Sequence, residues 1–148
     1  MERSELAQQY FEQGYNCAQA VALAFEDLLP VDKNNLAKLC SPFGGGMGRM
    51  RHVCGALSGS FVVYGLLNGY DGPETGNMKK DLYSQIQEIA NEFKKQNGSI
   101  ICSELLGLNK GENNSPVPTP RTSEFFQKRP CKEIVKLTAQ ILENKLNN

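Results

Sequence analysis

Cysteines are the residues of this sequence best suited to chemistry, and there are five of them. Four lie where a helix is expected to begin: Cys17, Cys54, Cys102 and Cys131. The first backbone N–H groups of a helix lack intrahelical partners and carry partial positive charge, so a thiol placed there ionises more easily. Because a thiolate is both a nucleophile and a metal ligand, this placement predicts redox or metal chemistry at the four residues.

Shared sulfur chemistry requires that the four helix starts meet at one end of the protein. Each cysteine also lies at the end of its helix's apolar stripe, which places the thiols on the core side. Two chemistries remain open: thiolates holding an iron–sulfur cluster or another metal, or two dithiol pairs that exchange electrons through disulfides. A closed zinc site would need ligands far apart in sequence rather than in Cys-x-x-Cys pairs. The alternative to all of these is that the cysteines are small apolar core residues.

A glycine-rich stretch, "FGGGMGRMRH" (43–52), directly precedes the second of these cysteines. One interpretation is a tight turn whose glycines supply positive φ angles. The functional interpretation is that free backbone N–H groups bind a cofactor or an anion, with arginine as the charge contact. The residues of this predicted site are Gly44, Gly45, Gly46, Gly48 and Arg49, with Arg51 beside them. Nucleotide binding is not expected, because the stretch lacks a Gly-Lys-Ser/Thr ending and no strand precedes it.

The fifth cysteine and the single histidine are given structural roles. Cys40 follows Leu36 and Leu39 at the end of a helical segment and is predicted to fill the core, a resolving thiol being the alternative. His52 is predicted to be an ordinary residue at a helix start rather than a further metal ligand. No carboxylate stands out that could orient it, so a catalytic Cys–His dyad is not expected.

The elements that must position these residues are helices, because apolar residues recur at helical spacing along most of the chain. Helices are predicted up to about Gly14, then over 16–28, 32–40, 53–67, 73–98, within 99–109, and over 131–146. Gly55 and Gly59 would let another helix approach closely, and residues 110–130 are predicted to be a proline-rich surface excursion. The fold class is therefore an all-α, single-domain helical bundle over residues 1–148.

Composition limits the function. The 148 residues carry 16 basic and 16 acidic side chains, and zero net charge argues against nucleic acid as the partner. The N-terminus has no signal-peptide core, and the apolar stretch 53–67 is shorter than the roughly 20 residues that span a bilayer. We therefore expect a cytoplasmic protein with no membrane span. In a reducing compartment, several thiols more often mean metal or redox chemistry than structural disulfides.

These motifs together resemble the C_GCAxxG_C_C family, which is described as redox-active. Its Cys-Gly-Ala-x-x-Gly motif matches Cys54, Gly55, Ala56 and Gly59. Its other characteristic cysteines match, in order, Cys17, Cys102 and Cys131. The resemblance covers nearly the whole chain and leaves Cys40 and His52 outside the pattern. It implies a redox function beside an oxidoreductase or electron-transfer partner protein, without fixing a reaction.

Three functions remain as hypotheses. The leading one is a redox-active protein, as an oxidoreductase component, whose four cysteines converge for electron transfer through an iron–sulfur cluster, another metal, or no cofactor. The second is a helical partner-binding module whose thiols are structural. The third is an anion-binding protein with Arg49 and Arg51 as charge contacts. Self-association into a homo-oligomer is compatible with each of them.

Overall fold

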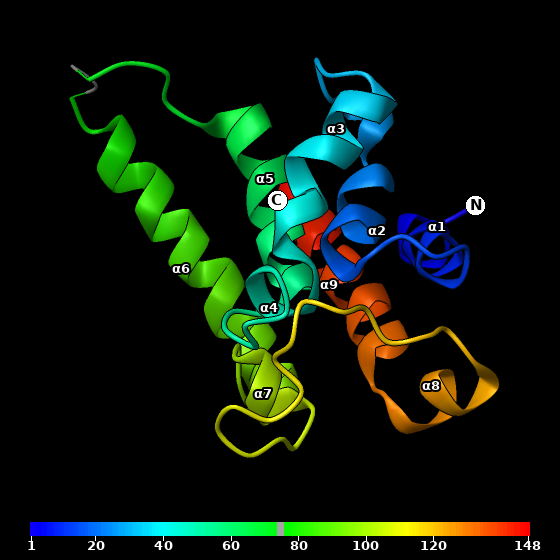
Figure 1. The fold of residues 1–148 in the computed structure, drawn as a ribbon. Coiled ribbons are helices and arrows are strands. Elements are labelled where there is room, and N and C mark those ends of the chain that lie inside the picture. Colours follow the sequence, from blue (N-terminus) through cyan, green and yellow to red (C-terminus); the bar gives the residue numbers. More distant parts are fainter. Residues whose placement is uncertain (74–75) are drawn as a thin grey trace.

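The computed structural model describes residues 1–73 and 76–148, and these residues form a bundle of helices (Figure 1). The helices are α1 (Arg3–Glu12), α2 (Cys17–Leu23), α3 (Lys33–Cys40), α4 (Gly44–Met47), α5 (Gly55–Asn68), α6 (Met78–Asn97), α7 (Cys102–Leu105), α8 (Ser123–Lys128) and α9 (Cys131–Leu146). Short 3₁₀ turns cover Glu26–Leu28 and Ser41–Phe43. Pairing of extended backbone within the described ranges is limited to one isolated bridge, Val53–Ile101. The predicted all-α class is confirmed.

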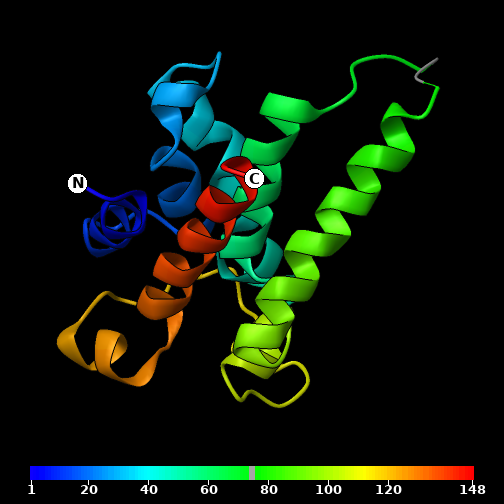
Figure 2. The same ribbon diagram turned by 180° about the vertical axis from the view of Figure 1, so that it is seen from behind.

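The core lies between α1, α2, α5 and α9. α2 packs against α5, α1 packs against both α2 and α9, and α9 also contacts α5 (Figures 1 and 2). The largest fully buried side chains include Phe11, Phe25, Phe93, Leu57 and Leu142. Burial of one such side chain contributes about 1.5–3 kcal/mol, so this apolar contact holds the four helices together.

Glycine determines how closely α5 approaches its neighbours. A Cβ atom at Gly59 would lie 2.4 Å from the carbonyl oxygen of Ala18 in α2. A Cβ atom at Gly55 would lie 2.7 Å from the carbonyl oxygen of Phe43 and 3.4 Å from Cβ of Cys17. The predicted close approach of another helix at these glycines is confirmed, and it brings the starts of α2 and α5 together.

The helix predicted over 16–28 is shorter than expected. α2 ends at Leu23, and a 3₁₀ turn follows over Glu26–Leu28. Helical backbone is lost at Phe25, which has φ −115° and ψ 9°. Pro30 then disfavours helical backbone in the residue before it, and Leu29 is extended with ψ 147°. Leu28, expected on the apolar stripe, is 45% exposed.

The helix predicted over 73–98 begins later, at Met78. Residues 74 and 75 of that prediction lie outside the described residues. The first half of α6 stands away from the rest of the bundle (Figure 2), so Met78 is 52% exposed, whereas Ile89 and Phe93 are buried. Gly98 ends the helix with φ 89°, as predicted.

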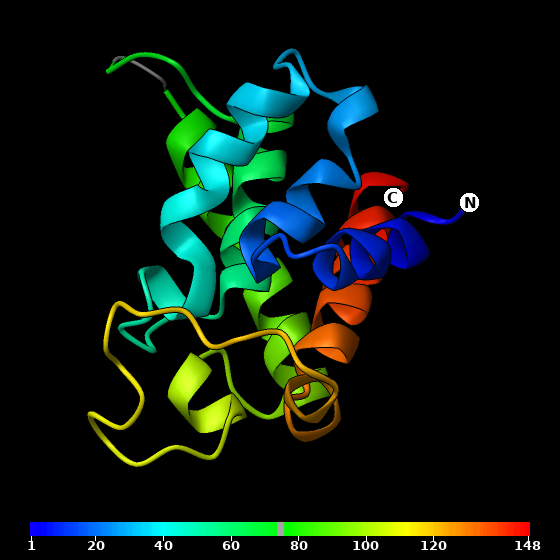
Figure 3. The same ribbon diagram turned by 45° about the vertical axis from the view of Figure 1, so that its right-hand side comes forward.

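The proline-rich excursion of residues 110–130 runs on the surface, as predicted. It crosses the end of the bundle where α4 and α7 lie and leads to α8 before α9 begins (Figure 3). Thr122 caps α8 by accepting a hydrogen bond from the Phe125 N–H at 3.2 Å. No helix within 1–73 and 76–148 is both long and apolar enough to cross a bilayer.

Candidate functional site

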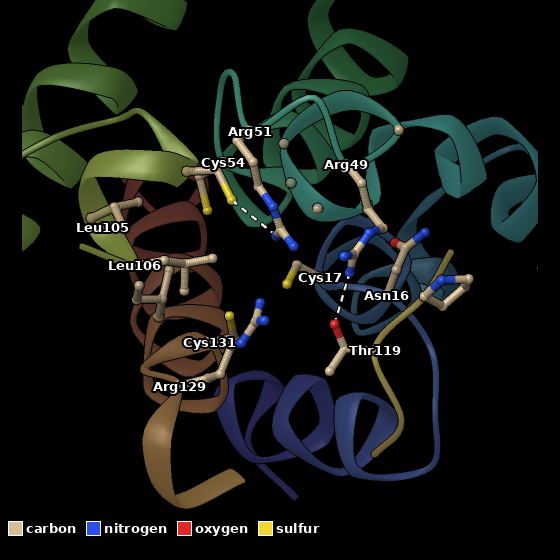
Figure 4. Close-up of a pocket in the computed structure, with 18 of the residues that line it drawn as sticks. Asn16, Cys17, Arg49, Arg51, Cys54, Leu105, Leu106, Thr119, Arg129 and Cys131 are labelled. Atoms are coloured by element: carbon tan, nitrogen blue, oxygen red, sulfur yellow. Dashed lines mark hydrogen bonds between the residues drawn. The ribbon is translucent and has the colours of Figure 1, made fainter. Parts of the chain in front are cut away.

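Four helix starts surround one cavity of about 420 Å³ (Figure 4). Cys17, Cys102 and Cys131 are the first residues of α2, α7 and α9, and Cys54 is the residue that precedes α5. All four cysteines line this cavity. The structure therefore brings together the four thiols that the sequence analysis singled out, from positions up to 114 residues apart in the sequence.

Backbone and side-chain hydrogen bonds fix the helix starts relative to one another. Asn16 caps α2 in a reciprocal pair with Gln19, and its amide nitrogen donates to the Ser41 carbonyl at 3.1 Å. The Cys54 N–H donates to the Ile100 carbonyl at 2.8 Å. The Cys102 N–H donates to the carbonyl of residue 52 at 2.6 Å. The chain thus holds the segments of Cys54 and Cys102 side by side.

The glycine-rich stretch is a left-handed turn at the rim of the cavity. A run of consecutive residues has φ between 61° and 76°: Gly45, Gly46, Met47, Gly48 and Arg49. Arg51 follows with φ 63°. Non-glycine residues in this region cost of order 1–3 kcal/mol each, and such strain persists where the surrounding structure imposes it. The interpretation as a turn with positive φ is confirmed; cofactor binding by Gly44, Gly45, Gly46 and Gly48 stays a prediction.

This turn places two arginines over the cavity. Gly46 makes the placement possible, because a Cβ atom there would lie 2.6 Å from Cβ of Cys102 and 2.9 Å from Cα of Arg51. Arg49 reaches the proline-rich excursion, donating from Nε to the Ser115 carbonyl at 2.8 Å and from Nη1 to Thr119 Oγ1 at 2.9 Å. The arginine therefore ties the excursion to the glycine turn, which sequence reasoning did not foresee.

Arg51 is the most deeply buried charged group at the cavity, with 5% of its surface exposed. Its Nε donates to the Asn113 carbonyl at 2.9 Å, and its Nη1 lies 3.7 Å from the sulfur of Cys102. Its Nη2 is buried and has no hydrogen-bond partner among the described residues. Figure 4 shows this guanidinium pointing into the cavity on the side of Cys17.

Two further arginines of the cavity were missed in the sequence. Arg121 donates to the carbonyls of Phe11 and Tyr15 at 2.8 and 3.1 Å, and its guanidinium lies 4.1 Å from the centre of the Phe11 ring. Arg129 lines the cavity beside the start of α9. Its position two residues before Cys131 was a usable signal, whereas Arg121 reaches the site only through the path of the excursion.

Cys17 and Cys131 are interacting thiols with opposite pKa shifts. The hydrogen bond from Cys17 lowers the pKa of Cys131 to about 7, against burial, and the charges of Arg129, Arg121 and Arg51 act in the same lowering direction. The same hydrogen bond, together with burial, raises the pKa of Cys17 well above its ordinary value. Near pH 7 the Cys131 thiol is therefore about half ionised, while Cys17 remains a thiol.

Cys54 and Cys102 are protonated at neutral pH. Burial raises the pKa of Cys54 to about 12 and outweighs the lowering effect of the Leu57 and Ala56 backbone N–H groups. Burial also raises the pKa of Cys102, although the neighbouring Arg51 acts in the opposite direction. The expectation that a helix start alone makes a thiol easy to ionise is wrong for these two cysteines, because desolvation is the larger effect.

The two residues given structural roles lie away from the cavity. Cys40 is completely buried in the core, and burial raises the pKa of its thiol to about 11, as suits a filler. The side chain of His52 is exposed and does not line the cavity. Neither residue joins the four cysteines.

The donor geometry bears on the metal site predicted at Cys17, Cys54, Cys102 and Cys131. Across residues 1–73 and 76–148, no three Cys, His, Asp or Glu side chains are grouped closely enough to hold one metal ion. The four thiols line one cavity, but they do not form a ready ligand set in this conformation. An iron–sulfur cluster or another bound metal therefore stays a prediction.

Taken together, the fold and the cavity define a small helical protein with a thiol site at converging helix starts. The family described as "Putative redox-active protein (C_GCAxxG_C_C)" matches residues 15–145, and the chain belongs to this family. An uncharacterized protein of Archaeoglobus fulgidus is 26% identical over 143 residues, which cover 90% of this chain and 85% of that protein. No solved structure matches the chain.

Proposed function

We propose that this protein transfers two electrons at a time by thiol–disulfide exchange at Cys131 and Cys17. The observation that carries the proposal is that Cys17 and Cys131 line one cavity and interact, so that the pKa of Cys131 is lowered to about 7. A thiol of that pKa is about half ionised at neutral pH and remains a good nucleophile. The second thiol lines the same cavity and interacts with the first, as a resolving cysteine must.

The reaction has two steps. The Cys131 thiolate attacks one sulfur of a substrate disulfide, forms a mixed disulfide and releases the other half of the substrate as a thiolate. Cys17, after loss of its proton, attacks the Cys131 sulfur, closes the Cys17–Cys131 disulfide and releases the second substrate thiolate. Two electrons pass from the pair to the substrate, and an oxidoreductase partner with a free dithiol restores the pair by the reverse sequence.

We assign Cys54 and Cys102 a separate role in this scheme. Both are protonated at neutral pH, and their segments are held side by side across the Val53–Ile101 bridge. They are the second dithiol of the site. After Cys131 and Cys17 have reacted, this dithiol reduces the Cys17–Cys131 disulfide and becomes the Cys54–Cys102 disulfide. This order follows from the pKa difference, because the more ionised thiol reacts first.

A redox titration with thiol counting tests the proposal. The protein is equilibrated in buffers of defined dithiol-to-disulfide ratio, and free thiols are counted after acid quenching. We expect the first transition to remove two thiols in one two-electron step, and mass spectrometry of its product to identify a Cys17–Cys131 bond. The matched control is Cys40→Ser, a buried cysteine outside the cavity, which leaves this transition in place.

The competing metal chemistry is tested on the same preparation. Anaerobically purified protein is measured for visible absorbance and for iron and zinc content. A brown protein with stoichiometric iron bound by the four cysteines would contradict the dithiol scheme. So would a first transition that is retained in the Cys17→Ser variant.

A further inference from the structure

The thiol pair does not account for the charge of the cavity. Its lining contains four arginines, namely Arg49, Arg51, Arg121 and Arg129, and no aspartate or glutamate among the described residues. None of the four forms an ion pair with a carboxylate within residues 1–73 and 76–148. The Cys131 thiolate supplies at most one negative charge, which leaves at least three positive charges without a counter-charge.

Mutual repulsion shows in the arginines themselves. Burial lowers the pKa of Arg49, and the charges of Arg51 and Arg129 lower it further. Burial likewise lowers the pKa of Arg121, while the Cys17 and Cys131 sulfurs act in the opposite direction. Such a group of cations is costly to hold together unless an anion enters among them.

Arg51 shows where the anion binds. Its side chain is 95% buried, two of its nitrogens have partners, and its Nη2 has none. Leaving a buried donor of a charged group without a partner is unfavourable, so the free N–H marks a place prepared for an acceptor. The guanidinium points into the cavity rather than to the protein interior (Figure 4).

The cavity is larger than an inorganic ion requires. Its volume of about 420 Å³ falls within the range of small-molecule sites, roughly 300–1,000 Å³. Apolar side chains line the space around the arginines: Phe11, Leu105, Leu106, Pro116, Phe125 and Ile134. An occupant that suits both the charge and the lining has an anionic group and an apolar body.

We infer that this cavity binds a small organic anion whose carboxylate or phosphate group pairs with Arg51, and that the disulfide acted on by the Cys17–Cys131 pair belongs to this class. The second part rests on the proposed function; the first does not. A ligand anchored at Arg51 lies beside Cys102 and near Cys17 and Cys131. In the exchange reaction, its disulfide sulfur accepts the Cys131 thiolate, and the leaving half departs as an anionic thiolate.

Binding is tested first with unreactive probes. Suberate (octanedioate) presents two carboxylates on an apolar chain, 1,8-octanediol is its uncharged counterpart, and inorganic phosphate tests the anionic group alone. By calorimetric titration of the full chain, we expect saturable binding of suberate or of phosphate and none of octanediol. Binding weakens as NaCl is raised, because the attraction is electrostatic.

Variants then locate the anion. Arg51→Gln is expected to weaken suberate binding roughly 10- to 100-fold, as loss of a charged, two-point contact does. Arg51→Lys keeps the charge but loses the forked, two-point contact, so its suberate affinity is expected to lie between those of the wild type and Arg51→Gln. Lys95→Gln, on the exposed surface of α6, removes the same charge and leaves binding unchanged. Wild-type protein that binds no probe, or binds octanediol as well as suberate, would overturn the inference without any variant.

Reaction with matched disulfides tests the substrate class. The dicarboxylate 3,3′-dithiodipropionate has the chain length of suberate, and bis(2-hydroxyethyl) disulfide is uncharged. We expect the reduced protein to react at least 10-fold faster with the dicarboxylate, and Arg51→Gln to remove this preference. Equal rates with both disulfides would overturn the anionic substrate and leave the thiol chemistry intact. Reaction with neither would instead contradict the proposed function, while suberate binding would still stand.

Discussion

Two helix starts of the cavity, those at Cys131 and Cys54, share the same local design and differ in the state of their thiols. Cys131 starts α9, and Cys54 is the residue that precedes α5. The pKa of Cys131 is lowered to about 7, whereas burial raises the pKa of Cys54 to about 12. Both cysteines stand at a helix start, so that position cannot be the cause of the difference between their pKa values.

The difference shows which effects decide a thiol's charge here. Cys54 has the N–H groups of Leu57 and Ala56 acting on its sulfur, as its place at a helix start predicts, and remains protonated because it is desolvated. Cys131 is also desolvated, but a neighbouring thiol donates to it and arginines face it. A specific hydrogen bond and nearby cations outweigh burial, and a helix start alone does not.

Alkylation measures this comparison directly and should show its largest effect. At pH 7, we expect iodoacetamide to modify Cys131 about 10²–10³-fold faster than Cys54, since the gain in thiolate is partly offset by the weaker nucleophilicity of a low-pKa thiol. Peptide mapping by mass spectrometry gives both rates. The Cys131 rate should rise with pH, reach half its maximum near pH 7 and then level off, because protonation below the pKa removes the nucleophile.

Close packing of α5 against α2 should give the next largest effect, on the free energy of unfolding. Gly59→Ala places a Cβ atom 2.4 Å from the Ala18 carbonyl oxygen and forces α5 away from α2. We expect the free energy of unfolding to fall by about 1–3 kcal/mol, measured by urea denaturation.

The matched control lies on the same helix. A Cβ atom at Gly65 would meet nothing within 4 Å, so Gly65→Ala only replaces a poor helix former. Its expected effect is a gain of up to about 1 kcal/mol. Equal losses for the two variants would mean that glycine is needed for backbone conformation and not for close approach.

These packing relations were largely readable from the sequence. The Gly55–Gly59 spacing predicted a close helix neighbour, and the helices predicted to begin at 16 and 32 begin one residue later, each after a side chain that caps it. Both signals are local. The exposed start of α6 was not predictable, because apolar periodicity at Met78 does not reveal whether a neighbour exists to cover it.

The candidate site divides in the same way. Its four cysteines could be found, because helix starts and apolar stripes are local patterns. The lowered pKa of Cys131 could not, since it depends on a contact between Cys17 and Cys131 across 114 residues of sequence. Arg121 was missed for a similar reason: the path of the excursion brings it to the cavity.

Two substitutions at Cys17 separate its hydrogen bond from its sulfur. Cys17→Ala removes both the donor and the resolving thiol, and we expect the pKa of Cys131 to rise by about one unit. Cys17→Ser keeps a donor, so the pKa should stay low while no intramolecular disulfide closes. The pH dependence of alkylation measures the pKa, and intact-mass spectrometry detects the trapped mixed disulfide. An unchanged pKa of Cys131 in Cys17→Ala would rule out the hydrogen bond as the cause of the pKa difference between Cys131 and Cys54.

The arginines should give the smallest effect, because each acts on Cys131 through space. For Arg129→Gln we expect the pKa of Cys131 to rise by about half a unit, and the shift to shrink at high salt as screening weakens the charge. Arg49→Gln is the matched control: Arg49 lines the same cavity, but its guanidinium is held by the Ser115 carbonyl and Thr119. Alkylation against pH at two salt concentrations measures both variants. Equal shifts would mean that Cys131 senses the total charge of the cavity, whereas a shift confined to Arg129→Gln would assign the lowered pKa to the cation at the start of its own helix.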